Sequence, residues 1–376
     1  MIPYGRQIID QADVDAVVEV LRSDFLTQGP AVPRFEAALR EATGAAHALA
    51  VNSATSALHV ACMALDLGPG DALWTVPNTF VASANCGLYC GASVDFVDID
   101  PATYLMDADA LEAKLATTAP PKVLVPVHFA GQTCDMERIG AVARAHGIRV
   151  IEDASHSIGA SYRGAPVGDC RFSDAAVFSF HPVKIVTTAE GGAVTTQDEM
   201  LARRVDLHRS HGVTRDPALM QGESEGGWYY EQVALGYNYR MTEMQAALGA
   251  SQMRRLGEFV DARHRIRARY DALLEGLPVV RPHQDPAGRS ALHLYPVQVE
   301  DRARVFAHLR EGGIGVNVHY IPVHLQPHYR AMGFARGNFP VAEAYYDRAI
   351  SLPLHPGLTE AEQDRVVEVL REAVGG

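Results

Sequence analysis

Apolar residues follow two alternating patterns from residue 13 to about residue 200. Short continuous apolar runs are typical of buried strands, and the stretches between them repeat apolar residues every three to four positions, as helices do. Strands are predicted at residues 47–51, 72–76, 93–97, 122–127, 149–152, 175–179 and 193–196, and helices at residues 13–21, 53–65, 81–90, 111–115 and 136–146. Repeated strand–helix alternation predicts an α/β fold, with a mostly parallel sheet covered on both faces.

The second part of the chain has a different pattern. A long helix is predicted over residues 243–274, followed by strands at 292–299 and 316–321 and helices at 302–311 and 341–348. Thr359 and Glu362 have the spacing of a capping box that begins a last helix. We therefore expect two domains, a large one over residues 1–250 that includes the N-terminal segment and a smaller α+β domain over residues 251–376.

Composition excludes several classes of function. The net charge of −12 and the pI of about 5.7 argue against a nucleic-acid partner, which requires a basic face. No apolar run approaches the ~18 residues of a membrane helix, and the first residues do not have the pattern of a signal peptide. The five cysteines are odd in number and irregularly spaced, as in proteins of a reducing compartment. We expect a cytoplasmic protein without a membrane partner.

Lysine is rare in this chain, and one of its three lysines has an unusual setting. Lys114 and Lys122 have ordinary polar surroundings, but Lys184 lies in the apolar run 178–192, where His181 is the other basic residue. Apolar surroundings lower the pKa of an amine and make it a nucleophile toward carbonyl groups. Arginine cannot do this because it keeps its proton. Lys184 is therefore the first candidate catalytic residue.

Two polar sites follow predicted strands. In residues 52–58, Ala54, Thr55 and neighbouring serines stand where a strand becomes a helix, which suits either an anion or simple N-capping. Asp153 follows a buried strand and needs a partner, which could be a backbone cap, an arginine or a protonated ring nitrogen. Pyridoxal 5′-phosphate (PLP) requires an amine, a carboxylate and an anion site. Together with Lys184, these two sites meet that requirement.

Seven segments carry a resemblance to a known family, and they extend nearly end to end. They are residues 26–30, 52–58, 79–82, 152–156, 179–184, 190–192 and 236–241. With them the chain resembles the DegT/DnrJ/EryC1/StrS sugar aminotransferases, which have the fold type I of aspartate aminotransferase. Residues 2–7, 23–30 and 179–192 are most similar to the members that act in pseudaminic acid biosynthesis. The resemblance implies C4 amination of UDP-4-keto-6-deoxy-N-acetyl-β-L-altrosamine, with L-glutamate as amino donor.

The resemblance also implies roles for individual residues. Lys184 would bond the cofactor aldehyde and shuttle the proton, and Asp153 would pair with the pyridine nitrogen. His156, where many members have Gln, would lie near the ring hydroxyl and share in catalysis. The remaining residues implied to bind the cofactor are Ala54 (by its backbone), Thr55 and Ser179 at the phosphate, Phe80 stacked on the ring, and Asn238 at the phosphate of a neighbouring subunit.

Substrate contacts are implied for Arg240, His319 and Tyr320, with Arg240 serving the donor carboxylate or the sugar of the neighbouring subunit. This arrangement would make the protein a homodimer with shared active sites. His319 and His324 lie close in sequence, but no Cys or acidic residue accompanies them at zinc-like spacing, so no metal is predicted.

Alternatives to this prediction remain within the same fold. The substrate could be another 3- or 4-keto dTDP-, UDP- or GDP-sugar. The protein could also be a PLP-dependent sugar dehydratase, although the members that remove a hydroxyl carry His where Lys184 stands. A non-catalytic regulator is disfavoured because Lys184 and Asp153 are both present.

Overall fold

Strand β5 (Arg149–Asp153) is the central strand of a seven-stranded sheet in the computed structural model, which describes residues 1–375. The order is β1 (His47–Val51), β9 (Gly192–Thr196), β8 (Ala175–Ser179), β5, β4 (Val123–Leu124), β2 (Ala72–Thr75) and β3 (Ser93–Phe96). Strand β9 runs antiparallel to both neighbours, and the other adjacent pairs are parallel. The predicted α/β fold with a mostly parallel sheet is confirmed.

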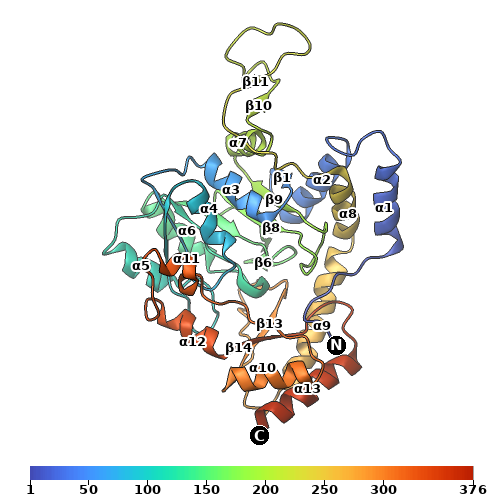
Figure 1. Ribbon diagram of the computed structural model, residues 1–376, viewed down its shortest axis with the longest axis vertical. Coiled ribbons are helices and arrows are strands. Elements are labelled where there is room, and N and C mark those ends of the chain that lie inside the picture. Colours follow the sequence, from blue (N-terminus) through green and yellow to red (C-terminus); the bar gives the residue numbers. More distant parts are fainter. Residues whose placement is uncertain (376) are drawn as a thin grey trace.

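Helices cover both faces of this sheet (Figure 1). They are α1 (Gln11–Leu21), α2 (Ala31–Thr43), α3 (Ala54–Ala64), α4 (Ala82–Tyr89), α5 (Ala108–Leu115), α6 (Met136–Ala145), α7 (Glu199–Arg209) and α8 (Glu243–Met253). In β8, Ala176 and Phe178 pack into the core with α2 and α8, whereas Ala175 and Val177 pack with α3 and α7. Both faces of the strand are thus apolar, which is why its sequence reads as a continuous run.

A separate hydrophobic core lies below this sheet in the view of Figure 1. It contains β13 (Tyr295–Gln298) paired with β14 (Ala349–Leu352), together with α10 (Arg302–Glu311) and α13 (Glu360–Gly375). Helix α9 (Leu256–Leu273) joins the two cores, because Phe259 packs into the sheet core and Tyr270 into the second one. The expected boundary at residue 250 stays a prediction.

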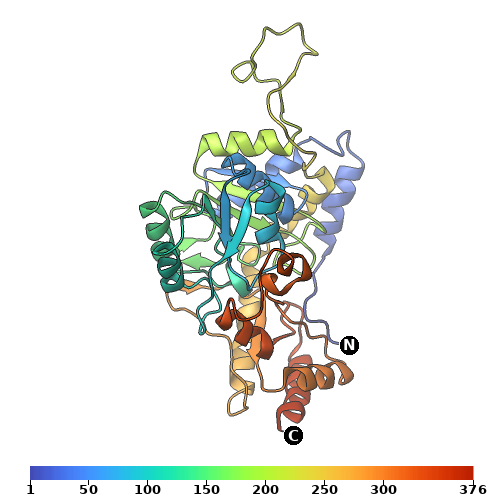
Figure 2. The ribbon, with the colours of Figure 1, turned by 60° about the vertical axis from the view of Figure 1, so that its left-hand side comes forward.

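The first residues of the chain reach this second core. The amide of Ile2 donates to the carbonyl of Gly313 at 2.9 Å, and the amide of Gly315 donates back to Ile2 at 2.6 Å. The amide of Leu354 donates to the carbonyl of Tyr4 at 3.0 Å. Three main-chain hydrogen bonds therefore hold the N-terminal segment against residues that follow it by more than 300 positions. Figure 2 shows the N-terminus near α10 and α13.

Two predicted elements are wrong, and several elements, among them α2, α7 and β14, were not predicted. The helix expected over residues 243–274 ends at Met253 and begins again at Leu256. Arg255, between the two helices, forms ion pairs with Asp10 and with the buried Asp13. Residues 316–321 form a single bridge at Asn317 instead of a strand, and helix α2 was not predicted. The capping box is confirmed, since Thr359 and Glu362 exchange hydrogen bonds at its two ends.

An arm formed by residues 211–236 projects from the body of the molecule above α7 (Figure 1). It contains the two-stranded pair β10 (Val213–Thr214) and β11 (Glu231–Gln232). Trp228, Tyr230 and Leu235 on this arm are exposed. The remaining short elements are β6 (Ser161–Tyr162), β7 (Ala165–Pro166), β12 (Gly288–Arg289), α11 (Pro327–Arg330), α12 (Pro340–Arg348) and the 3-10 turns Phe129–Gly131 and Val323–Leu325.

Candidate active site

The carboxyl ends of β1, β5 and β8 border one cavity of about 570 Å³. Parallel strands bring polar residues that follow them to the same edge of a sheet. Nine of the eleven predicted site residues line this cavity: Ala54, Thr55, Phe80, Asp153, His156, Ser179, Lys184, His319 and Tyr320. Their chemical roles remain predictions.

Asp153, the last residue of β5, is buried and points its carboxylate at two donors. The Ser83 hydroxyl donates to Oδ2 at 2.6 Å, and the backbone amide of Ser155 donates to Oδ1 at 3.1 Å. Ser83 is the second residue of helix α4. A carboxylate offers about four acceptor positions, so lone pairs remain free after these two hydrogen bonds. Asp153 can therefore hold a protonated ring nitrogen in the cavity.

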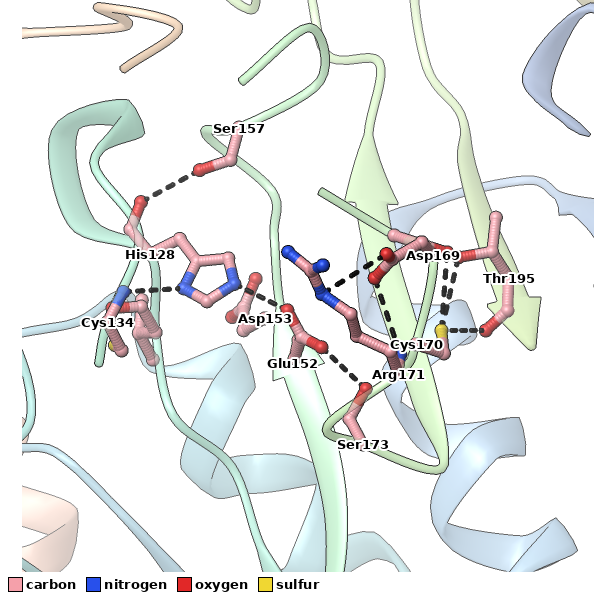
Figure 3. A network of polar contacts seen from close by, with 12 residues as sticks. His128, Cys134, Glu152, Asp153, Ser157, Asp169, Cys170, Arg171, Ser173 and Thr195 are labelled. Atoms are coloured by element: carbon pink, nitrogen blue, oxygen red, sulfur yellow. Dashed lines mark hydrogen bonds and ion pairs between the residues drawn. The ribbon is translucent and has the colours of Figure 1, made fainter. Parts of the chain in front are cut away.

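Glu152, the neighbour of Asp153, belongs to a separate buried network (Figure 3). Its carboxylate lies 2.7 Å from Nε2 of His128 and accepts from the Ser173 hydroxyl at 2.5 Å. The backbone amide of Cys134 donates to Nδ1 of His128, so Nε2 carries the proton toward Glu152. The amide of His128 donates to the carbonyl of Asp153 at 3.0 Å. This network fixes the backbone from which Asp153 projects.

Lys184 lies in the loop after β8, where its backbone amide donates a hydrogen bond to the carbonyl of His181 at 2.9 Å. Burial lowers the pKa of Lys184 to about 8, and the nearby charge of Asp153 opposes this effect only in part. A substantial fraction of the amine is therefore neutral near physiological pH, whereas an ordinary lysine is almost entirely protonated. The structure gives Lys184 the lowered pKa that a nucleophilic amine requires.

The start of helix α3 forms the third part of the cavity wall. Ser53 caps the helix by accepting from the amide of Ser56 at 3.1 Å. Within residues 1–375, the amides of Ala54 and Thr55 have no hydrogen-bond acceptor. A Cβ atom on Gly192 would lie 2.5 Å from the Ala54 nitrogen, so only glycine leaves this approach open. Free amides at a helix N-terminus can bind an anion, so the Ser53 cap leaves these two amides available to one.

Three buried histidines face the cavity. Burial lowers the pKa of His156 and of His293 well below the usual range, and it lowers the pKa of His319 to about 3. His319 Nδ1 lies 2.8 Å from the Ser351 hydroxyl, and the rings of His156 and His293 are 4.3 Å apart. All three are therefore neutral at physiological pH. Among the described residues that line the cavity, Lys184 is the one that carries a positive charge, and none is an arginine.

Two predicted site residues do not line this cavity. Asn238 forms a bridge with Ser210, and Arg240 forms one with Val51 at the end of β1. Among the lining residues that the sequence prediction missed are Tyr4, Ser83 and His293. The sequence could have identified His293, because it is a lone polar residue in the apolar run 291–297. No comparable sequence feature marks Tyr4 or Ser83.

The family of the chain follows from comparison with known proteins. The model of the DegT/DnrJ/EryC1/StrS aminotransferase family matches residues 7–371. The chain belongs to this family. It is 40% identical to the spore coat polysaccharide biosynthesis protein SpsC of Bacillus subtilis over 100% of this chain and 97% of that protein. It is 38% identical to the GDP-perosamine synthase of Caulobacter vibrioides, over 97% and 96%.

A solved structure agrees with this assignment. Helicobacter pylori PseC, described as an aminotransferase involved in the biosynthesis of pseudoaminic acid, superposes with a TM-score of 0.92. The two chains are 32% identical, and the match covers 100% of this chain and 99% of PseC. The protein is therefore a PLP-dependent sugar aminotransferase with the fold of that family.

The cavity of this aminotransferase fits PLP. Asp153 can pair with the ring nitrogen, the free amides of Ala54 and Thr55 can hold the phosphate, and Lys184 can bond the aldehyde. When bound, PLP supplies an electron sink for the carbon that exchanges its amino group.

No helix within residues 1–375 is long and apolar enough to cross a membrane.

Proposed function

We propose that this aminotransferase transfers the amino group of L-glutamate to C4 of UDP-4-keto-6-deoxy-N-acetyl-β-L-altrosamine. The observation that carries the reaction type is that Lys184 and Asp153 line the same cavity, where the lowered pKa of Lys184 leaves a fraction of its amine neutral. Nζ of Lys184 would take a proton from the α carbon of the donor and give one to C4 of the sugar. Asp153 would keep the ring nitrogen protonated, and Phe80 would cover the ring face.

The neutral histidines of the cavity wall support a sugar as acceptor. His156, His293 and His319 are neutral, and Lys184 is engaged at the reacting carbon. Neutral imidazole nitrogens match the hydroxyl and acetamido groups of a sugar ring. The similarity to PseC supports the pseudaminic acid precursor in particular.

We also propose that two copies of the chain share their active sites. Asn238 and Arg240 lie outside the cavity of their own chain. The donor carboxylate and the sugar diphosphate are anionic, yet no arginine among the described residues lines the cavity. Asn238 and Arg240 of a second copy would supply this missing contact, and the exposed aromatic residues of the arm provide further surface for a homodimer.

A spectroscopic experiment tests the first half of the reaction. We expect the PLP-loaded protein to absorb in the visible range and to lose this absorbance on addition of L-glutamate. Borohydride should trap the cofactor on Lys184, as peptide mapping would show. Lys184→Arg should abolish turnover because arginine is neither nucleophile nor base. Normal turnover in this variant would contradict the proposed role.

A substrate panel tests the second half. Because the chain is also 38% identical to a GDP-perosamine synthase, a GDP-linked 4-keto-sugar is the second candidate acceptor. The protein loaded with the amino form of the cofactor is offered UDP- and GDP-linked keto-sugars, and products are identified by mass spectrometry and NMR. Preferred amination of the GDP-sugar would replace our proposed substrate and leave the reaction type intact.

A further inference from the structure

A chain of hydrogen bonds with a fixed direction begins at the backbone of Ala130. The amide of Ala130 donates to Nδ1 of His156 at 3.2 Å. A backbone amide is always a donor, so this nitrogen of His156 must be an acceptor without a proton. The orientation of the imidazole and the position of its proton are thereby set by the main chain.

The backbone that presents this amide is held in an uncommon conformation. Ala130 has φ of +58° and Gly131 has φ of +97°. The amide of Ala291 donates to the carbonyl of Gly131 at 3.0 Å, and the amide of Leu294 donates to Ala130 at 3.3 Å. A left-handed conformation is strained for alanine and persists where its surroundings require it. The two hydrogen bonds from residues 291–294 hold Ala130 and Gly131 in this conformation.

The chain of hydrogen bonds continues from His156 to Tyr320, with each group donating to the next. Burial lowers the pKa of His156 well below its usual range, so the ring is neutral and its single proton is on Nε2. Nε2 lies 3.2 Å from the Tyr320 hydroxyl and donates to its oxygen. Burial and the charge of Asp153 raise the pKa of Tyr320, so the hydroxyl keeps its own proton. Among the described residues this proton has no acceptor, and Tyr320 lines the cavity.

The substituents of the PLP ring indicate which oxygen receives this proton. The ring nitrogen is opposite the aldehyde carbon, and the phosphate arm and the phenolic oxygen flank that carbon on opposite edges. With the nitrogen at Asp153, the aldehyde at Lys184 and the phosphate at Ala54 and Thr55, the phenolic edge faces the remaining wall. His156 and Tyr320 stand on that wall.

We propose that Ala130, His156 and Tyr320 form a directed donor chain whose last hydroxyl donates to the phenolic oxygen of the PLP ring. Tyr320 is then a cofactor-positioning residue, in place of the substrate contact that the sequence implied. The inference rests on the proposed function, because it requires the ring orientation set by Asp153 and Lys184. A donated hydrogen bond to an anionic oxygen fixes the ring against rotation in its plane.

NMR of the cofactor-free protein tests the direction of the chain. In protein labelled with ¹⁵N-histidine, long-range ¹H–¹⁵N correlations identify which ring nitrogen carries the proton, and loss of a signal in His156→Gln assigns it. We expect His156 to be neutral with its proton on Nε2 at pH 7.5. A proton on Nδ1, or an imidazolium, would overturn the proposed donor chain. The proposed aminotransferase function would be unaffected by that result.

A ligand–variant comparison tests the acceptor. Pyridoxamine phosphate and its analogue without the phenolic oxygen are titrated into wild-type protein and Tyr320→Phe, with fluorescence as readout. We expect the variant to lose about tenfold in affinity for pyridoxamine phosphate and to bind the analogue as the wild type does. An equal loss for both ligands would overturn the proposal.

Tyr345→Phe is the matched control. The Tyr345 hydroxyl donates to the carbonyl of His319 at 3.0 Å, so it supports the same segment but does not line the cavity. We expect this variant to bind both ligands like the wild type; a Tyr320-like difference in it would refute the assignment to Tyr320. If wild-type protein binds neither ligand, the proposed function itself fails, whereas binding without the difference removes only the donor chain.

Discussion

Replacing Lys184 with methionine should stabilise the cofactor-free protein while it abolishes activity. Lys184 is partly buried at the cavity wall, and its charge has one opposing group nearby, Asp153. Methionine has a similar length and no charge, so it fills the same space without the cost of burying an ammonium group. The residue that we assign to catalysis would thus be a source of instability.

The size of the effect follows from the pKa of Lys184. Its pKa falls from 10.5 to about 8 in the folded protein, which corresponds to about 3 kcal/mol. Below pH 8 both the folded and the unfolded forms carry the proton, so the cost is fully present. Between pH 8 and 10.5 the folded form loses its proton first, and the cost declines as pH rises. Above pH 10.5 the cost is absent.

Guanidinium unfolding of the cofactor-free protein measures this difference. At pH 7 we expect Lys184→Met to be more stable than the wild type by about 2–3 kcal/mol, and the advantage should shrink as pH approaches 10. Lys122→Met is the control, because Lys122 is partly exposed and paired with Asp71. It should show no such pH-dependent gain. A Lys184→Met variant no more stable than the wild type at pH 7 would refute the reasoning.

Three further substitutions test other contacts. The Glu243 carboxylate accepts hydrogen bonds from the backbone amides of Ala31 and Val32 at 2.6 and 3.1 Å. Glu243→Ala should therefore lower the free energy of unfolding by about 2–4 kcal/mol, and Glu243→Gln should lower it by less. Urea unfolding measures both effects. Ser83→Ala removes the 2.6 Å bond to Asp153 and should weaken PLP binding about tenfold, measured by fluorescence titration; unchanged affinity would contradict the role of that bond. Gly192→Ala would place a methyl group 2.5 Å from a backbone nitrogen of the phosphate site, so phosphate-bearing cofactor should bind more weakly while pyridoxal without phosphate is affected less.

The sheet could be predicted from the sequence because its information is local. In β8, a continuous apolar run identifies a strand buried on both faces. Helix α2 was missed because its start is set from far away, by the Glu243 carboxylate that accepts its first amides. The break between α8 and α9 was missed because apolar periodicity continues on both sides, and the pairing of Arg255 with Asp13 is a tertiary contact.

The residues of the candidate site also differ in whether the local sequence could identify them. Lys184, Asp153 and the start of α3 could be identified because each has an unusual residue type for its local pattern. Tyr4 and Ser83 could not, because they reach the cavity only through contacts distant in sequence, such as the bond between Leu354 and Tyr4. Hydrogen-bond direction is likewise invisible in a sequence, since Ala130 contributes a backbone amide and no side chain.

The pairing of Ile2 with Gly313 and Gly315 has a consequence for the order of assembly on the ribosome. Strand β1 pairs with β9, and Ile2 pairs with residues beyond 312, so both must wait for partners that are made much later. Nascent chains would expose β1 throughout this interval. An affinity tag placed before Met1 would extend from the segment that brings Tyr4 to the cavity, whereas a tag after the last helix would leave that wall untouched.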